Sequence, residues 1–201
     1  MGSKNIISKH ILPIMLSNRS YNQYWVEPFV GGANIIDKVY GNRIGADKNK
    51  YTIALLKAVQ NGWIPPVKIS EQMYRAVKNN PSYYLDELSG FVGFSAYGGK
   101  WFGGYPRCNT VSRYNRFLES ANNLKKQSYK LIGVSFICCD YRELDIPENS
   151  LIYCDPPYAN TTQYKNKFDH KDFWEWCRQK SDEGHKVFIS EYKAPKDFVC
   201  V

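Results

Sequence analysis

Short apolar runs, each ending at an acidic residue or a tight turn, recur along this chain and restrict its possible folds. The runs at 24–30, 44–46, 131–140, 151–154 and 186–190 are typical of strands. Apolar stripes at 34–40, 49–60 and 169–181 indicate helices between them, and a segment at 5–16 predicts a helix interrupted near Pro13. Strands alternating with helices predict an α/β fold with a largely parallel sheet covered by helices.

The alternation stops between residues 61 and 110, where Gly, Pro, Asn and Tyr are frequent. Segment 91–106 contains five glycines and six aromatic residues. A basic helix is predicted to follow over 111–129. We therefore expect one domain made of residues 1–57 and 134–201, with a second domain, residues 58–133, inserted into it.

Charge is distributed unevenly along the 201 residues, whose net charge is +8. Residues 1–59 carry a net +5, residues 60–133 a net +6 and residues 134–201 a net −3. A basic region of this size favours a polyanionic partner, although a solvated basic surface is an alternative that charge alone leaves open. No apolar run approaches the roughly 20 residues of a membrane span.

The six cysteines include no Cys-x-x-Cys pair, and the three histidines have no metal-ligand spacing. We therefore expect no metal site, and free thiols in a reducing compartment. The polar first residues lack the apolar core of a signal peptide. These observations predict a cytoplasmic protein.

The strongest chemical signal is the turn Asp155-Pro156-Pro157-Tyr158, which follows the apolar run at 150–154. Two prolines fix the backbone and lack N–H groups, so their carbonyls can face a cavity as acceptors. A carboxylate, stiff carbonyls and an aromatic ring would meet at the carboxyl end of a strand, where open α/β sheets bind ligands. These groups suit the binding of a planar base that carries an amino group. Pro-Pro turns also occur only to make the backbone rigid, and this alternative stays open.

Three other acids occupy places where a ligand could bind. Glu27 lies in an apolar run just before a glycine pair, where a carboxylate is costly without partners. Asp47 ends the next strand, where a carboxylate commonly accepts from ribose hydroxyls, unless it caps the following helix. Asp140 ends a third strand and precedes Tyr141, and this pair could bracket an adenine or simply cap a turn.

Together these residues resemble the Dam-type (D12 class) adenine-N6 DNA methyltransferases, which use S-adenosylmethionine. The family's Glu-Pro-Phe segment and glycine turn are matched at 27–32, its ribose-binding acid at Asp47 and its Asp-aromatic pair at Asp140-Tyr141. Its catalytic Asp-Pro-Pro-Tyr is matched at 155–158, and its N-terminal Gly-x-Lys more loosely at 2–4. The order of these segments also fits, and the resemblance covers nearly the whole chain.

The resemblance implies a Rossmann-like S-adenosylmethionine-dependent methyltransferase sheet with a mostly helical DNA-recognition insertion. It implies methyl transfer to the adenine N6 amine of double-stranded DNA by direct attack from a flipped base. The residues implied to hold S-adenosylmethionine are Lys4, Glu27, Phe29, Gly31, Gly32, Asn34, Asp47, Asp140, Tyr141 and Asp155. The implied catalytic residues are Asp155, Pro156, Pro157 and Tyr158, and the implied DNA contacts are Lys100, Arg107, Arg113, Arg116, Lys125 and Lys126.

The chain departs from the family pattern in two places. The second glycine of the family turn is displaced, because the sequence reads Gly31-Gly32-Ala33. The run at 197–201 predicts a further strand where relatives continue into a closing hairpin, so we expect an abbreviated sheet or a chain cut short.

Two alternative functions stay open: methylation of the cytosine N4 amine, and DNA binding by a relative that has lost catalysis.

Overall fold

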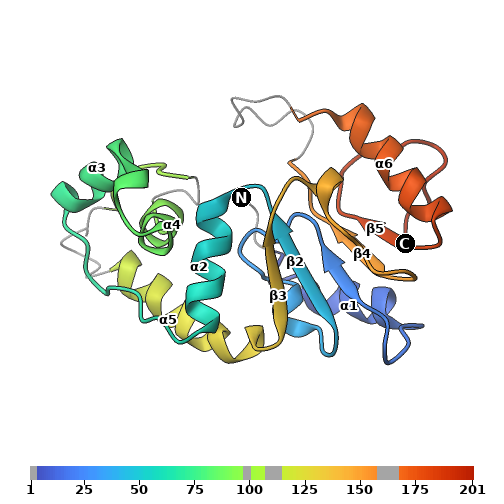
Figure 1. Ribbon diagram of the computed structural model, residues 1–201, viewed down its shortest axis with the longest axis horizontal. Coiled ribbons are helices and arrows are strands. Elements are labelled where there is room, and N and C mark those ends of the chain that lie inside the picture. The colour runs from blue at the N-terminus through green and yellow to red at the C-terminus, as the bar shows by residue number, and fades with distance from the viewer. Residues whose placement is uncertain (1–3, 97–100, 107–114, 158–167) are drawn as a thin grey trace. The chain divides into compact units, whose positions relative to one another are not determined.

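The computed structural model describes residues 4–96, 101–106, 115–157 and 168–201 (Figure 1). Two compact units can be distinguished: a helical unit formed by residues 49–132, and a sheet unit formed by residues 4–48 and 133–201. The predicted insertion began at residue 58, whereas the structure groups the whole helix α2 (Lys50–Gln60) with the helical unit.

The sheet of the described residues has five parallel strands in the order β3-β2-β1-β4-β5, which confirms the expected α/β class (Figure 1). The strands are β1 (Trp25–Glu27), β2 (Arg43–Asp47), β3 (Val134–Cys138), β4 (Leu151–Cys154) and β5 (Lys186–Ile189). The chain builds outward from β1 in one direction through β2 and β3, then in the other through β4 and β5. Sheets of this kind bind ligands at the carboxyl ends of the strands where the order reverses, which here is between β1 and β4.

Successive residues of a strand point to opposite faces, and the two faces of this sheet are covered differently. On one face, Val26 and Ile152 belong to the same buried cluster as Phe173, Trp176 and other residues of α6 (His170–Asp182). Helix α6 begins at the predicted place because the Asp169 carboxylate accepts from the backbone N–H groups of the first turn, at 2.9 and 3.1 Å. On the opposite face, Trp25 stacks on Tyr153 with the ring centroids 5.9 Å apart.

The helical unit contains α2, α3 (Glu71–Asn79), α4 (Asp86–Phe94) and α5 (Arg116–Ser128). Helices α2 and α4 pack closely because Gly90 has no side chain. A Cβ atom at that position would lie 2.3 Å from the Tyr51 carbonyl oxygen and 3.1 Å from Leu55 Cβ. The sequence predicted α2 and α5, but the abundance of Gly, Asn and Tyr in the segment between them concealed α3 and α4.

Four predictions of single helices and strands need correction. The strand expected at 24–30 ends at Glu27, and the helix expected at 34–40 is only a short 3-10 turn, η1 (Ile36–Lys38), because Val39 is already extended. Helix α1 (Ser8–Leu16) continues through Pro13. The run at 197–201 forms no strand: Asp197 pairs with Arg178 at 2.6 Å, and Phe198 packs on Trp174.

Three expectations from composition can be compared with the described part of the chain. No helix there is both long and apolar enough to cross a membrane. No three His, Cys, Asp or Glu side chains in the same ranges are grouped to hold a metal ion. The described cysteines are free thiols, namely Cys138, Cys139, Cys154, Cys177 and Cys200.

Candidate functional site

The carboxyl ends of β1 and β4 bring together acidic groups that are far apart in the sequence. Glu27 ends β1 and Asp155 follows β4, and the two strands are paired neighbours. Lys4 lies at the same place, because its Nζ is 2.7 Å from Asp155 Oδ1. Their side chains are only 10% and 26% exposed, so this ion pair is partly shielded from solvent. Three residues predicted for one site thus meet where the strand order reverses.

Glu27 is almost completely buried, with 3% of its surface exposed. Residues two apart in a strand share a face, and the Trp25 indole N–H accordingly donates to Glu27 Oε1 at 2.8 Å. Burial raises the pKa of Glu27 to about 8; the charges of Asp37 and Asp155 also raise it, while the Trp25 hydrogen bond and Lys38 oppose the rise. The carboxyl group is therefore predominantly protonated at neutral pH.

The glycine turn after β1 is tied to the end of β2. The Gly31 N–H donates to Asp47 Oδ2 at 3.1 Å, and the Val30 N–H donates to the Ala46 carbonyl at 2.8 Å. Gly31 has φ 48° and Ala33 φ 55°, so an alanine occupies a left-handed position that favours glycine. Asp47 therefore positions the turn. It is not the helix cap that the sequence left open, since Asn49 caps α2.

Gly32 and Asn34 adjoin this turn. A Cβ atom on Gly32 would lie 2.9 Å from Asn34 Nδ2, so the backbone and the amide side chain are already in close contact. The Lys38 ammonium donates to the Asn34 carbonyl and to Asp37 Oδ1, at 2.6 and 2.7 Å. These contacts fix the segment that leads from the turn into η1.

Asp140 is held by two cations at the end of β3. Arg142 donates to both carboxylate oxygens, at 2.8 and 3.0 Å, and Lys48 donates to one at 3.2 Å. The Arg142 guanidinium holds the pKa of Asp140 well below its usual range. Asp140 also accepts from the Arg142 backbone N–H, so it caps a short 3-10 turn, η5 (Tyr141–Glu143).

Phe29 and Tyr141 contact each other, with their ring centroids 5.2 Å apart. Tyr141 is 7% exposed and also packs edge-on against Trp176 at 5.2 Å. Its burial raises the pKa of the phenol to about 12. The Tyr141 ring therefore contributes to the core beneath α6, and contact of the Asp140-Tyr141 pair with an adenine stays a prediction.

The remaining predicted site residues are only partly within the described ranges. Pro156 is buried and Pro157 half-buried, directly after β4. The predictions for Tyr158, Lys100, Arg107 and Arg113 lie outside the described residues.

Arg116, Lys125 and Lys126 were predicted to contact DNA, and all three lie on α5. Arg116 is half-buried in its first turn, whereas Lys125 and Lys126 are exposed in its last. Lys125 follows Arg116 by nine positions, so at 100° per residue these two side chains lie on opposite sides of the helix. The three cations therefore do not form a single face of α5.

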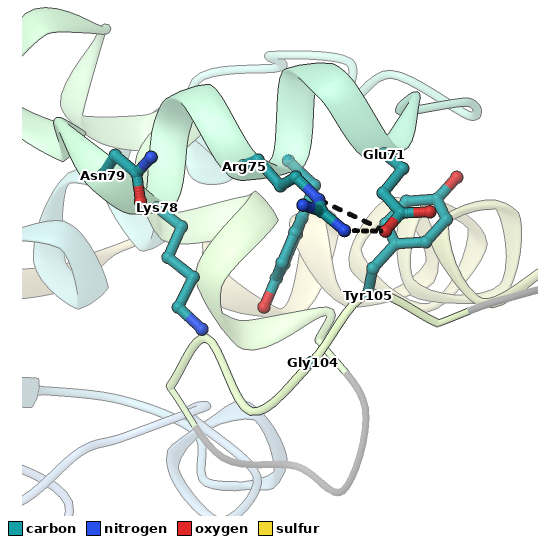
Figure 2. Close-up of a pocket in the computed structure, with 7 residues that line it drawn as sticks. Glu71, Arg75, Lys78, Asn79, Gly104 and Tyr105 are labelled. Atoms are coloured by element: carbon teal, nitrogen blue, oxygen red, sulfur yellow. Dashed lines mark hydrogen bonds and ion pairs between the residues drawn. The ribbon is translucent and has the colours of Figure 1, made fainter.

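Sequence reasoning missed an open pocket of about 330 Å³ in the helical unit (Figure 2). Figure 2 shows Arg75 turned toward Glu71, to which it donates at 2.7 Å. A signal for the helix α3 that carries these residues was present, since Ser70 caps it and Tyr74 and Val77 recur at helical spacing on its buried side. The pocket is lined by Glu71, Tyr74, Arg75, Lys78, Asn79, Gly104 and Tyr105.

The chain is similar in sequence to known DNA methyltransferases. Residues 1–95 and 103–198 match the family described as D12 class N6 adenine-specific DNA methyltransferase. The chain is also similar to a protein named DNA adenine methylase from Haemophilus influenzae, with 27% identity over 164 residues. That match covers 70% of this chain and 57% of the relative, so the chain spans a little over half of the relative's length. Because the family match extends over nearly all of its residues, the chain belongs to the D12 class of N6 adenine-specific DNA methyltransferases.

Proposed function

We propose that this chain transfers a methyl group from S-adenosylmethionine to the N6 amine of adenine in double-stranded DNA. The observation that carries the proposal is the position of Asp155. Its carboxylate follows β4 at the point where the strand order reverses, and Lys4 holds it at 2.7 Å. Membership of the D12 class supports adenine as the target base.

The residues around the carboxyl ends of β1 and β2 fit S-adenosylmethionine. This cofactor supplies an activated methyl group on a positively charged sulfur. Beside the end of β1, the Glu27 and Asp37 carboxyl groups would accept hydrogen bonds from the cationic part of this cofactor. Asp47 fixes the turn at Gly31. Asp47 and this turn would hold the nucleoside part of the cofactor.

Asp155 and the prolines that follow it would hold the target amine. The Asp155 carboxylate and the Pro156 carbonyl accept the two amino hydrogens, which makes the nitrogen lone pair more available for direct attack. Lys4 fixes the orientation of the carboxylate through its 2.7 Å contact. The rate enhancement comes from positioning and electrostatics, without a covalent enzyme intermediate. The proton that the nitrogen loses passes to Asp155 or to water.

Analysis of the modified nucleoside tests this function. Unmethylated double-stranded DNA is incubated with the protein and methyl-labelled S-adenosylmethionine, then digested to nucleosides. We expect the label in N6-methyldeoxyadenosine. Label in N4-methyldeoxycytidine would support the cytosine alternative, and bound but unlabelled DNA would support a DNA-binding relative without catalysis.

Substitution of Asp155 tests the catalytic assignment. We expect Asp155→Asn to lower the methyl-transfer rate by roughly 100-fold or more, since it removes the negative charge that orients the amine. Cofactor affinity should change by less than about threefold, because the target amine, not the cofactor, is this carboxylate's main partner. Asp145→Asn removes an exposed carboxylate and serves as the matched control. Transfer at the unaltered rate by Asp155→Asn would refute the assignment.

A further inference from the structure

One wall of the pocket in the helical unit is the polar face of α3 (Figure 2). Glu71, Arg75 and Lys78 follow one another at spacings of four and three residues, so their side chains lie on the same face of this helix. Asn79 borders that face. Figure 2 shows Lys78 extending toward the segment that carries Gly104. Among the described residues, the lining of the pocket therefore includes two cations and one acid.

A second wall of the pocket is formed by Gly104 and Tyr105. The Tyr105 hydroxyl donates to the Ile69 carbonyl at 2.8 Å, and the Tyr105 ring packs on the Tyr74 ring with the centroids 5.7 Å apart. Gly104 has φ 153°, a backbone angle that residues with a side chain rarely adopt. Bare backbone thus borders the pocket at this position, where a ligand can approach closely.

Glu71 holds the Arg75 guanidinium by one edge. Arg75 Nε and Nη2 both donate to Glu71 Oε1, at 3.2 and 2.7 Å. In the described part of the chain, these bonds leave the end of the guanidinium that Nη1 and Nη2 form open to other acceptors. The Arg75 side chain is 68% exposed, so a ligand can reach this end. Its two parallel N–H groups match two oxygens of a phosphate group.

Lys78 supplies a second positive charge to the same pocket. Its side chain is exposed and forms no ion pair with the other lining residues, as Figure 2 shows. A lysine ammonium binds phosphate as a point charge. The surrounding residues 49–132 contain twelve Lys and Arg against four Asp and Glu. The field of this unit therefore favours a polyanion as the ligand.

We propose that the pocket on α3 binds a phosphodiester group of DNA, with the Arg75 guanidinium on two phosphate oxygens and the Lys78 ammonium beside them. The inference rests on the proposed function for DNA as the partner. It adds a DNA contact in the helical unit, separate from the residues proposed to hold the cofactor and the target amine. Because phosphates are the same in every sequence, this contact contributes to affinity for DNA and not to the choice of site.

Fluorescence anisotropy with short duplexes tests the contact in the whole chain. The double variant Arg75→Ala, Lys78→Ala should bind DNA roughly tenfold more weakly, and its plot of log affinity against log salt should be shallower by about 0.9, the value for one phosphate. Alanine at exposed helix positions favours the helix, so the variant should fold, and circular dichroism checks this. The matched control replaces Lys57 and Lys68 by alanine, which removes the same charge from exposed positions of the same unit.

Two duplexes separate a phosphate contact from the reading of a base. Arginine can also bind guanine through two hydrogen bonds, so one duplex has mixed sequence and the other contains only A·T pairs. The double variant on α3 should lose affinity by the same factor on both duplexes. A loss confined to the mixed-sequence duplex would overturn the phosphate contact in favour of guanine recognition.

Methyl transfer by the unaltered protein keeps the two proposals apart. If the unaltered protein methylates adenine in DNA while the α3 variant and the control variant show equal affinities and equal salt slopes, the phosphate contact is overturned and the proposed function stands. If the unaltered protein neither binds DNA nor methylates it, both are overturned.

Discussion

Burial of a single residue, Glu27, makes folding itself dependent on pH. Its pKa is about 8 in the folded chain against an ordinary value of 4.5, so the folded state holds the proton more tightly. Stability from this group is fully present below pH 4.5 and is lost as the pH rises to 8. The free energy of unfolding should fall by up to roughly 5 kcal/mol across this window.

Urea unfolding at pH 5, 6, 7 and 8 checks this expectation in the unaltered chain and in Glu27→Gln. The difference in unfolding free energy between the two should shift by several kcal/mol in favour of the variant as the pH rises. Burial lowers the pKa of His185 and makes stability rise with pH near the ordinary histidine value of 6.5, but this effect is common to both proteins and cancels. A difference in unfolding free energy that does not change with pH would contradict the raised pKa of the buried Glu27.

Single residues also show where prediction from sequence ends. The acid Glu27 within an apolar strand and the acids Asp47 and Asp155 at strand ends are visible in the sequence, because they break an apolar pattern at a definite place. The Lys4–Asp155 contact spans 151 positions and depends on where the chain before α1 lies, which no local pattern encodes. The left-handed Ala33 is hidden for a similar reason, since nothing in its residue type signals a positive φ.

At the scale of elements, local signals decided which segments could be predicted. Strand β4 and helix α6 were predicted to within a residue, because turn residues flank the first and Asp169 caps the second. Helix α4 was missed because Gly90 and Gly93 lower its intrinsic helix propensity. Both glycines are needed for packing: a Cβ atom on Gly93 would lie 2.4 Å from the Trp101 ring. Tertiary packing here overrides propensity.

The contact between α2 and α4 therefore yields a prediction for the helical unit. Gly90→Ala should lower the free energy of unfolding by about 1–3 kcal/mol, because the new methyl group collides with the Tyr51 carbonyl and forces the helices apart. Gln72→Ala, on the exposed side of α3, is the matched control and should change stability little. Thermal unfolding followed by circular dichroism measures both. A Gly90→Ala protein more stable than the original, as helix propensity alone would predict, would refute the close packing.

Across the whole molecule, the net charge is confined to one of the two units. Residues 49–132 contain twelve Lys and Arg against four Asp and Glu, a net +8, which leaves fifteen of each in the rest of the chain. The cofactor and catalytic residues proposed above thus lie in a unit with no net charge, whereas the unit without them is strongly basic. This division favours attraction of DNA by the helical unit, through a field that does not depend on base sequence.

Salt dependence tests this division of charge in the whole chain. The logarithm of DNA affinity should fall linearly with the logarithm of salt concentration, with a slope of about −0.9 for each phosphate contacted. Replacement of Lys125 and Lys126 by alanine should weaken binding equally for all DNA sequences and reduce the slope by up to about 2, because both side chains are exposed on α5. The matched control replaces Lys180 and Lys186, at the end of α6 and the start of β5, which removes the same charge from the neutral unit. Fluorescence anisotropy with short duplexes at several salt concentrations gives both slopes. Equal slopes for the two double variants would mean that α5 makes no special contribution to DNA attraction.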